Sequence, residues 1–509
     1  MKSFVDEFKN PTNRYGATPF WFLNGDLTEE ELKWQIKDMK EKGLGGYVMH
    51  SRYGRRLPYF SEDFFDRIGT IVDESEKLGM NAIVYDEDDW PSGMSGTKVI
   101  DDHPEFKHKQ MELVYLDVTG KSNLEYTPDK GVIYKAYACK FSKKSDKKEE
   151  CIVSESKDIT PTENVINVSF DGEAYDSVVV FLFQEVSGYT IYTTYPKNKG
   201  FRAQPDTWNW YFPFGEYVDL LNKDAVAYFI ETTCEEYKKR YGEHFGKAIK
   251  YFFTDEPGFY TVMRGNDSAV AWSDVFAETF KERKGYDIKD NILALAYETG
   301  GKTKRVRYDY YDHLTHLFEH NFVKQYSDWC TSNGIKLTGH YRLCYPQLVW
   351  QRNYAGNVMS MFRQMGAPGT DRLDTPGMND TFATKDWSWQ IEDKLCSSIG
   401  HQYNIERRMT ESFACSGWEY RFADMKRVTD WQYMMGMNMM VPHAFHYSIS
   451  GQRKKECIPS FFYQNPTWQN YNKYSEYLCR LGEMLIGGEH IADIVILNPM
   501  TTIWADDIP

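Results

Sequence analysis

Several features that define common protein classes are missing from this 509-residue sequence. No run approaches the roughly 20 apolar residues of a membrane-spanning helix. The nine cysteines are scattered and show no CxxC spacing, so the sequence predicts neither a zinc site nor a disulfide framework. No basic stripe is present either, and the net charge of −14 disfavours a nucleic-acid or anionic-membrane partner.

The beginning of the sequence gives no sign of export. Residues 1–8 lack the apolar core of a signal peptide. The expected location is therefore the cytoplasm, and it becomes secreted or periplasmic if the native N-terminus lies upstream of this sequence. The sequence indicates no oligomeric state.

Aromatic residues are frequent, at 16% of the chain. Aromatic rings stack on the apolar faces of sugars, so a carbohydrate-binding protein would use them. The alternative is a large core filled with aromatic side chains. Composition alone favours the core, and the position of aromatic residues beside strand-end acids favours sugar binding.

The first hundred residues repeat a unit of apolar strand, capped helix and terminal glycine. Thr28 is expected to cap the first helix, with Glu31 completing a capping box, and Gly79 is expected to end the second helix. This repeat is typical of parallel βα units. The first three strands are expected at 17–23, 46–52 and 82–85.

The β-rich runs between about 105 and 200 lack helices and predict an antiparallel β-domain inserted after strand 3. The βα repeat then resumes, and eight strand-like runs favour a (β/α)8 TIM-type barrel. The expected domains are a catalytic barrel at 1–104 and 205–488, the inserted domain at 105–204, and the start of a truncated C-terminal domain or linker at 489–509. Later strands are expected at 253–256, 335–340, 367–373, 409–411, 441–447 and 491–497, and later helices at 220–241, 271–333, 387–400, 422–435 and 471–485.

The stretch Tyr251-Phe-Phe-Thr-Asp-Glu-Pro-Gly258 carries the strongest chemical signal, because a short apolar strand stops there at two acids. Adjacent strand residues point to opposite faces, so only one acid should face a pocket; we expect Glu256, with Asp255 in a supporting role. Glu411 follows a second apolar step. Because parallel barrels place active sites at the C-terminal ends of strands, Glu256 and Glu411 are the predicted catalytic pair, one donating a proton and the other acting as base or nucleophile. The alternative for each is a structural strand-end carboxylate.

A dense acidic run follows the third strand. Asp86, Glu87, Asp88 and Asp89 repel one another, so arginines, hydroxyl donors or a hard cation must offset their charges. The run does not match the ligand spacing of an EF-hand. It predicts a rigid turn that binds substrate or metal, with a solvated charge run as the alternative.

Other polar residues fall at the expected strand ends and should converge on one rim of the barrel. They suit recognition of sugar hydroxyl groups better than proton transfer, although each alone would pass for an ordinary satisfied polar residue. Arg342, Asp374 and His443 are of this kind. The predicted substrate-binding set is Asp86, Glu87, Asp88, Trp90, His50, Arg52, Asp255, His340, Tyr341, Asp371, Trp418 and His446.

Several motifs follow one another along the chain: Arg14-Tyr-Gly-Ala-Thr-Pro-Phe-Trp-Phe-Leu-Asn-Gly-Asp26, Tyr85-Asp-Glu-Asp-Asp-Trp-Pro-Ser-Gly93, Phe253-Thr-Asp-Glu-Pro257, Thr410-Glu-Ser-Phe-Ala-Cys-Ser-Gly-Trp418 and Asp424-Met-Lys-Arg-Val-Thr-Asp-Trp-Gln432. Together they resemble glycoside hydrolases of the family 106 α-L-rhamnosidase type. The resemblance implies a (β/α)8 barrel with β-sandwich additions and inversion by two carboxylates, at the positions of Glu256 and Glu411. It also implies a calcium ion that could help hold the hydroxyl groups of the sugar. Members of that family usually carry further C-terminal β-domains.

The string Asp255-Glu256-Pro257 is also similar to the strand-four acid/base of retaining clan A glycosidases, with Glu411 at the position of their strand-seven nucleophile. The function hypothesis is an exo-acting glycoside hydrolase that cleaves a terminal sugar, with an α-L-rhamnoside as the expected substrate. A retaining, galactosidase-like glycosidase and a catalytically inactive carbohydrate-binding barrel are the alternatives. The sequence leaves open which glutamate is the acid, and it fixes no metal ligand.

Overall fold

A parallel β-sheet forms the centre of the protein. The computed structural model describes residues 4–52, 54–88, 90–145, 150–170, 175–185, 216–260, 269–341, 348–373 and 388–506. Every neighbouring pair of strands in this sheet is parallel. In spatial order its strands are β15 (Met439–Pro442), β14 (Met409–Ala414), β13 (Ala367–Leu373), β12 (Lys336–His340), β10 (Tyr251–Asp255), β3 (Asn81–Asp88), β2 (Gly46–Ser51), β1 (Phe20–Leu23) and β16 (Phe445–His446).

The two ends of this sheet meet, so that the nine strands form a nearly closed barrel. The end strands β15 and β16 are consecutive in the chain and are separated only by His443 and Ala444. β16 pairs with β1, and the backbone N–H of Thr18, just before β1, donates to the carbonyl of Met440 in β15 at 2.9 Å. The strands predicted at 335–340 and 367–373 are confirmed almost to the residue.

Apolar side chains fill the interior of the barrel below its C-terminal rim. Phe20, Phe22, Tyr85 and Phe253 belong to a buried cluster contributed by strands on several sides of the sheet. The ring of Phe20 meets that of Phe253 edge-on, with 5.0 Å between centroids. This layer excludes water from beneath the strand ends on which the predicted site residues lie.

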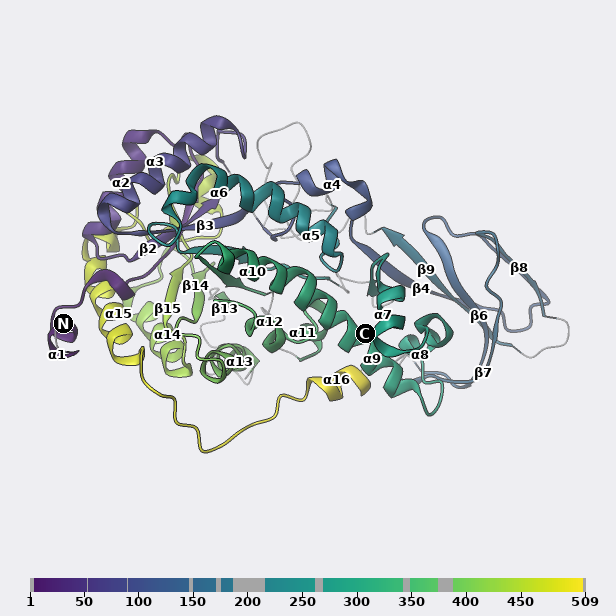
Figure 1. Ribbon diagram of the computed structural model, residues 1–509. Coiled ribbons are helices and arrows are strands. Elements are labelled where there is room, and N and C mark those ends of the chain that lie inside the picture. The colour runs from purple at the N-terminus through teal and green to yellow at the C-terminus, as the bar shows by residue number, and fades with distance from the viewer. Residues whose placement is uncertain are drawn as a thin grey trace.

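Helices cover the outside of the sheet (Figure 1). The Thr28 hydroxyl accepts a hydrogen bond from the Glu31 backbone N–H, which begins α2 as predicted, and Gly79 ends α3 with a left-handed φ of 63°. The predicted capping box is not formed, because the Thr28 backbone N–H donates to the Tyr447 hydroxyl and not to Glu31. The helices predicted at 422–435 and 471–485 are confirmed to the residue. The helices are α1 (Phe4–Lys9), α2 (Glu29–Glu41), α3 (Glu62–Leu78), α4 (Lys98–Asp102), α5 (Lys223–Phe229), α6 (Glu235–Tyr241), α7 (Phe276–Lys284), α8 (Leu293–Ala296), α9 (Thr303–Leu317), α10 (Gln325–Ser332), α11 (Leu348–Tyr354), α12 (Val358–Phe362), α13 (Ser388–Gln402), α14 (Phe422–Met435), α15 (Tyr471–Leu485) and α16 (Met500–Asp506).

Short π-helical turns join some of these helices into longer ones. The turn Ile230–Cys234 connects α5 to α6, so the helix predicted at 220–241 is present as one helical stretch. The turn Phe318–Lys324 connects α9 to α10 in the same way. The helical region predicted from 271 begins instead with a short strand, because the apolar run before Ser273 pairs with another strand.

A second, antiparallel sheet lies to one side of the barrel (right in Figure 1). All but one of its strands come from the chain between β3 and β10, and β11 joins its edge by pairing with β4. Buried Val178, Val180 and Ala136 form part of its own apolar core. The strands are β4 (Lys109–Asp117), β6 (Val132–Lys143), β7 (Ile152–Asp158), β9 (Ser177–Glu185) and β11 (Ala269–Trp272), and the pair β5 (Asn123–Tyr126) and β8 (Ile166–Ser169) lies beside them.

The chain after α15 does not form the strand predicted at 491–497. The segment is extended along the surface (yellow in Figure 1) and has no strand partner among the described residues. Its apolar run from Ile494 to Leu497 is at least 80% exposed. The prediction is wrong because β-branched residues favour a strand only when a neighbouring strand completes the hydrogen bonds. α16 then packs back onto α9, with Met500 and Trp504 buried.

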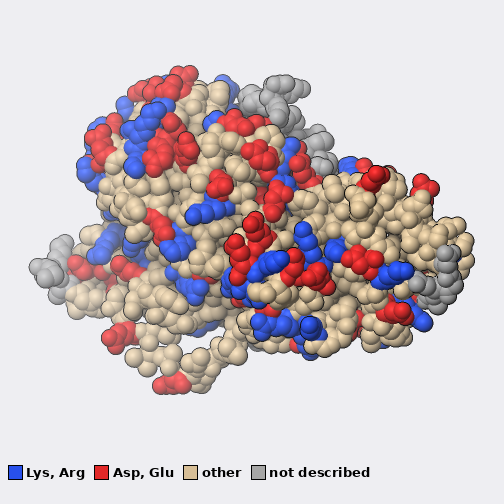
Figure 2. Space-filling model, turned by 45° about the vertical axis from the view of Figure 1, so that its right-hand side comes forward, with Lys and Arg blue, Asp and Glu red and all other residues tan. Residues whose placement is uncertain are grey.

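Charged side chains of both signs are interspersed over the face drawn in Figure 2. Among the described residues, no helix is long and apolar enough to cross a membrane.

We predict that Gly339→Ala destabilises the barrel strongly. Gly339 precedes His340 in β12 with a φ of 126°, and a Cβ atom there would overlap the backbone carbonyl of Thr254 in β10. The expected loss in free energy of unfolding is on the order of 3 kcal/mol, from strain and overpacking together. The measurement is urea unfolding followed by circular dichroism.

Gly79→Ala is the matched control. Gly79 also has a positive φ, but nothing lies within 4 Å of its added Cβ. That variant should lose about 1 kcal/mol. Equal losses in the two variants would contradict a steric role for Gly339.

Candidate active site

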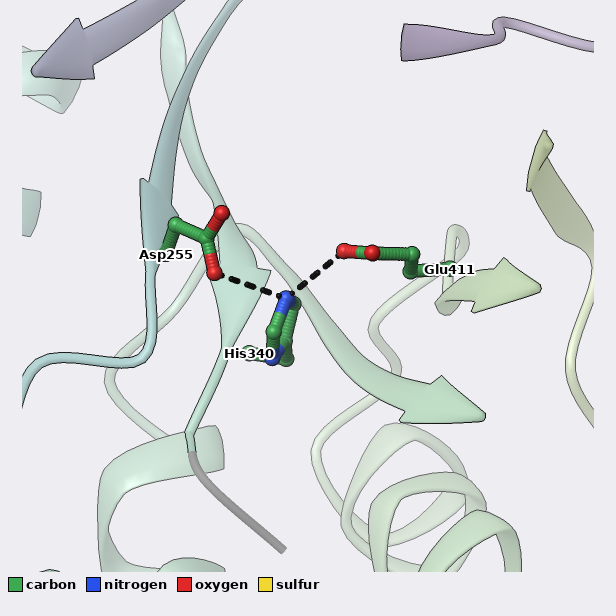
Figure 3. Close-up of side chains that lie close together, drawn as sticks. All are labelled: Asp255, His340 and Glu411. Atoms are coloured by element: carbon green, nitrogen blue, oxygen red, sulfur yellow. Dashed lines mark hydrogen bonds and ion pairs between the residues drawn. The ribbon is translucent and has the colours of Figure 1, made fainter. Parts of the chain in front are cut away.

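A buried imidazole connects acids from two strands at the C-terminal rim of the barrel. His340 ends β12 and lies in register with Asp255, which ends β10. Its Nε2 is 3.2 Å from Oδ1 of Asp255 and 2.9 Å from Oε2 of Glu411 (Figure 3). The Tyr85 hydroxyl donates to the other oxygen of Asp255 at 2.6 Å. The four groups form one continuous hydrogen-bonded chain across the strands β3, β10, β12 and β14.

Glu256 joins the same site because it leaves the regular strand. Its φ of 46° is left-handed, and its backbone N–H donates to the carbonyl of His340 at 3.2 Å. Ligand atoms of Glu256, His340 and Asp371 lie within 4.8 Å of one another. The expectation that only one of Asp255 and Glu256 faces the site is therefore wrong. The left-handed residue breaks the alternation of side chains, so both acids reach the same imidazole.

Asp371 brings a fourth carboxyl group to this cluster. It lies on β13 in register with Glu411 on β14, so the two side chains leave the sheet on the same face. Both are buried, at 5% and 4% exposure. His443, from the turn between β15 and β16, lies on the other side of Glu411, with Nε2 3.9 Å from Oε1.

Burial and charge together set the proton affinities of this cluster. Burial raises the pKa of Glu411 to about 7, although its hydrogen bond to His340 lowers it. Burial also raises the pKa of Asp371 well above its usual range, and the negative charge of Glu411 adds to this shift. Burial by itself lowers the pKa of His340, but the hydrogen bonds and charges of Asp255 and Glu411 outweigh burial and hold it well above its usual value. His340 is therefore a positively charged imidazolium that lies between the carboxyl groups of Asp255 and Glu411.

The acidic run after Tyr85 is not a turn, because β3 continues through Asp88. Glu87 accepts hydrogen bonds from the backbone N–H groups of Asp88, Met94, Ser95 and Gly96. Burial raises the pKa of Glu87 to about 7, and these hydrogen bonds partly offset that shift. This carboxylate folds the 93–96 segment around itself.

The other two described acids of the run also have protein partners. Asp88 accepts two hydrogen bonds from Arg55, at 2.8 and 2.9 Å, and one from the Ser51 hydroxyl at 2.6 Å. Asp86 accepts a hydrogen bond from Ser92 at 2.5 Å. Asp89 lies outside the described residues. Substrate binding by this run stays a prediction.

Ser92 connects the acidic run to the site. Its Oγ accepts a hydrogen bond from the backbone N–H of Asp255 at 2.8 Å, and its own N–H donates to the carbonyl of Asp255 at 2.9 Å. Ser92 and Tyr85 both fix Asp255, and sequence reasoning missed both roles. The position of Tyr85 directly before the acids was a weak indication of a role in the site. Nothing in the sequence paired it with Asp255, which is distant in the chain.

Arg52 braces the neighbouring part of the rim. Its Nε donates to Glu456 at 2.7 Å, and its guanidinium lies 4.1 Å from the ring centroid of Trp90. Nη1 is 3.2 Å from Nε2 of His50, whose ring stacks on Tyr85 at 3.7 Å. These contacts link three of the predicted binding residues, Arg52, His50 and Trp90, to the Asp255 side of the site.

The remaining predicted residues lie in different surroundings. His446 is buried, with Nε2 3.2 Å from the backbone carbonyl of Glu456. Tyr341 is fully buried and donates to Sδ of Met365, while Trp418 is 37% exposed beyond the end of β14. Arg342 and Asp374 lie outside the described residues. The binding roles of these residues stay predictions.

The cluster suits a hard cation only in part. Among the described residues, two groups could hold a metal ion: Asp255, His340 and Glu411, or Glu256, His340 and Asp371. Calcium takes six to eight oxygen ligands, which the carboxylates can supply but an imidazole nitrogen cannot. His340 already bridges two of these acids, so a calcium ion fits the carboxylate oxygens of this cluster and not its imidazole.

The arrangement can move a proton at a buried carboxyl group. A carboxyl with a pKa near 7 exchanges its proton at neutral pH, and a second acid, Glu256, approaches the same imidazole from another direction. Two carboxyl groups with different surroundings divide acid and base roles in glycoside hydrolysis.

We predict that Glu87→Gln destabilises the protein, because the amide that replaces one carboxylate oxygen faces backbone donors. The expected loss is about 2–3 kcal/mol of unfolding free energy. It is measured from the urea unfolding midpoint, with Glu30→Gln on the exposed face of α2 as control. An unchanged midpoint in Glu87→Gln would contradict its role as anchor of the 93–96 segment.

Comparison with known proteins gives related results from sequence and from structure. A protein of Formosa agariphila, provisionally named a beta-glucuronidase, is 21% identical over 531 residues, which span 96% of this chain and 42% of that protein. The rhamnosidase from Novosphingobium sp. PP1Y has the same fold, with a TM-score of 0.66 at 13% identity over 96% of this chain and 61% of its own. The chain thus spans less than two thirds of the length of either relative.

The family model for alpha-L-rhamnosidase of glycoside hydrolase family 106 matches residues 211–509. That region is more than half of the chain, and it contains Asp255, Glu256, His340, Asp371 and Glu411. The chain therefore belongs to the alpha-L-rhamnosidase family of glycoside hydrolases, family 106.

Proposed function

We propose that this protein is an exo-acting glycoside hydrolase that removes a terminal α-L-rhamnosyl residue with inversion, using Glu256 and Glu411. The observation that carries the proposal is the buried contact of His340 with Glu411, in a cluster that also contains Glu256. The family and the fold support a glycosidase, and the cluster supplies the two carboxyl groups that such a reaction needs.

Glu411 is the proposed general base. Its Oε2 accepts the hydrogen bond of a positively charged imidazole, which favours the ionised carboxylate and fixes its direction. A pKa of about 7 makes it a stronger proton acceptor than an ordinary carboxylate, and it is still ionised above neutrality. In the reaction Glu411 takes a proton from water as the water attacks the anomeric carbon.

Glu256 is the proposed general acid. It lies beside His340 and Asp371 but off the regular strand, so its carboxyl group approaches the cluster from a different direction than that of Glu411. When ionised, Glu411 disfavours a further negative charge on the nearby Glu256. In the reaction Glu256 would donate a proton to the glycosidic oxygen as the glycosidic bond breaks.

The charge of the site favours a neutral sugar. Four carboxyl groups surround His340, and the guanidinium of Arg52 is paired with Glu456. A glucuronide, the substrate class named for the Formosa relative, would bring another carboxylate into this surrounding. A deoxy sugar such as rhamnose avoids that repulsion, and its methyl group can pack against an aromatic side chain at the rim of the barrel.

Calcium is proposed as a substrate-binding ion on the basis of the family resemblance. Asp371, which has no role in the proposed acid–base pair, would supply a carboxylate oxygen to the calcium ion. When bound, calcium offers ligand positions to the hydroxyl groups of the sugar.

The fold is proposed to be a (β/α)8 barrel with the antiparallel sheet as an inserted domain. β15 and β16 follow each other directly and pair with β14 and β1 on either side, as the two halves of one interrupted eighth strand would. The strands β4 to β9 lie between β3 and β10 in sequence, which supports an insertion after the third strand.

We predict that the effect of Glu256→Gln depends on the leaving group and that the effect of Glu411→Gln does not. Glu256→Gln should slow hydrolysis of a phenyl rhamnoside by about a hundred- to ten-thousand-fold. It should affect a dinitrophenyl rhamnoside far less, because that leaving group needs no proton. Glu411→Gln should slow both substrates to a similar extent. The measurement is kcat/KM for each substrate.

Glu406→Gln, an exposed acid, is the control for the substitution itself. Full activity in both active-site variants would refute the assignment, and an inactive wild type on rhamnosides, galactosides and glucuronides would favour a binding protein. Proton NMR of the first product decides the stereochemistry: retained configuration would favour the clan A mechanism instead.

We predict an acidic limb in the pH profile that depends on His340. If Glu411 must be ionised, kcat/KM falls as the pH decreases through about 7. The charge of His340 lowers the pKa of Glu411, so His340→Gln should raise that pKa and move the limb to higher pH. The measurement is kcat/KM against pH for a phenyl rhamnoside.

His313→Gln is the matched control, since His313 is a buried histidine on α9 that bonds Thr279. The acidic limb of the His313→Gln pH profile should lie at the same pH as that of the wild type. A limb that moves to lower pH in His340→Gln would contradict the proposed contact.

A further inference from the structure

Two cysteines meet at the edge of the candidate site. Cys415 follows β14, which carries Glu411, and Cys457 follows the short helix Gly451–Lys455. Both belong to one small buried cluster with Ala414, and they are 4% and 8% exposed. The backbone N–H of Gly417 donates to the carbonyl of Ile458 at 3.5 Å, so the two segments run side by side at this point.

The two sulfur atoms interact directly. Cys457 hydrogen-bonds with the thiol of Cys415, and this contact, ahead of burial, raises the pKa of Cys415. Arg52 Nη2 donates to Sγ of Cys457 at 3.3 Å. Cys415 is also close enough to Asp371 and Arg52 to feel both charges. The pair therefore lies between the acid cluster and the Arg52 brace.

We propose that Cys415 and Cys457 form a reversible disulfide, a redox modification site at the rim of the barrel. The oxidant is a small peroxide. The thiolate of Cys457 attacks a peroxide oxygen and becomes a sulfenic acid as the O–O bond breaks and the leaving oxygen takes up a proton. The sulfur of Cys415 then attacks the sulfenic sulfur, its proton leaves with the hydroxyl group as water, and the S–S bond forms.

Position and neighbours assign the first attack to Cys457. Cys457 is the more exposed residue of the two, and its sulfur accepts a hydrogen bond from Arg52, whereas Cys415 is held in its thiol form. Phe413 and Cys415 both have left-handed backbones, with φ of 76° and 59°, so the chain leaves the regular strand at this point.

The disulfide would couple two parts of the site. Cys415 follows the strand that carries Glu411. Cys457 is adjacent to Glu456, whose carboxylate accepts a hydrogen bond from Arg52 at 2.7 Å. The bond would close the chain from 415 to 457 into a loop that contains α14, β15 and β16. Closing a long loop restricts the unfolded chain, so the oxidised protein should be the more stable form.

The test is differential alkylation of the native protein after treatment with a slight excess of hydrogen peroxide. Free thiols are blocked under denaturing conditions, disulfides are then reduced, and the released thiols take a heavy label that is read by peptide mass spectrometry. We expect the heavy label on Cys415 and Cys457, its removal by dithiothreitol before blocking, and a higher thermal midpoint in the oxidised protein.

Matched variants make the outcome decisive. Cys457→Ser should leave Cys415 without heavy label and abolish the gain in thermal midpoint, and Cys415→Ser should likewise abolish the gain in thermal midpoint. Cys234→Ser removes a fully buried cysteine beside Cys330 and should leave the labelling of Cys415 and Cys457 unchanged. Absence of heavy label on the wild-type pair, or heavy label on Cys415 in Cys457→Ser, would overturn the proposal.

Discussion

The buried imidazole of His340 is the interaction on which the site depends. Acids from β10, β13 and β14 are brought together in the barrel interior, where an uncompensated carboxylate is expensive. His340 lies between two of them, and the same two acids hold its charge in place. Without a cation at this position, the pKa of Glu411 would be higher, and less of this carboxyl group would be ionised at neutral pH to act as a base.

The support for this contact comes from a part of the chain that does no chemistry in the proposal. Asp88 ties the end of β3 to Arg55 in the segment after β2, and Glu87 fixes the segment after β3 through backbone N–H groups. That segment carries Ser92, which bonds both backbone groups of Asp255. Each described acid of the run, Asp86, Glu87 and Asp88, thus accepts hydrogen bonds from protein donors of its own. From the sequence, the charge of this run indicated a ligand site. Contacts within the protein also account for the presence of these acids.

Much of the fold could be predicted from the sequence, because periodicity and caps are local. The bounds of α14 and α15 follow from apolar spacing, and strand ends that stop at acids locate the rim. The left-handed backbone of Glu256 could not be predicted, since it depends on a hydrogen bond to the His340 carbonyl, far away in the chain. The partners of Asp255 were hidden for the same reason. The exposed apolar run after α15 led to the opposite error, the prediction of a strand that does not form. The local preference of residues for a strand carries no information about whether a partner strand is present.

Sheet register explains why a histidine has to stand where it does. Neighbouring parallel strands are about 4.8 Å apart, so residues in register on adjacent strands bring their side chains close together. Asp371 and Glu411 are in register in this way, and the negative charge of Glu411 raises the pKa of Asp371. Asp255 is in register with His340 instead, which replaces a second repulsive pair by an attractive one. Glu256 lies outside both pairs because its backbone turns away from the strand. The sheet thereby separates one acid from the paired ones, which is the asymmetry that an acid and a base in one site require.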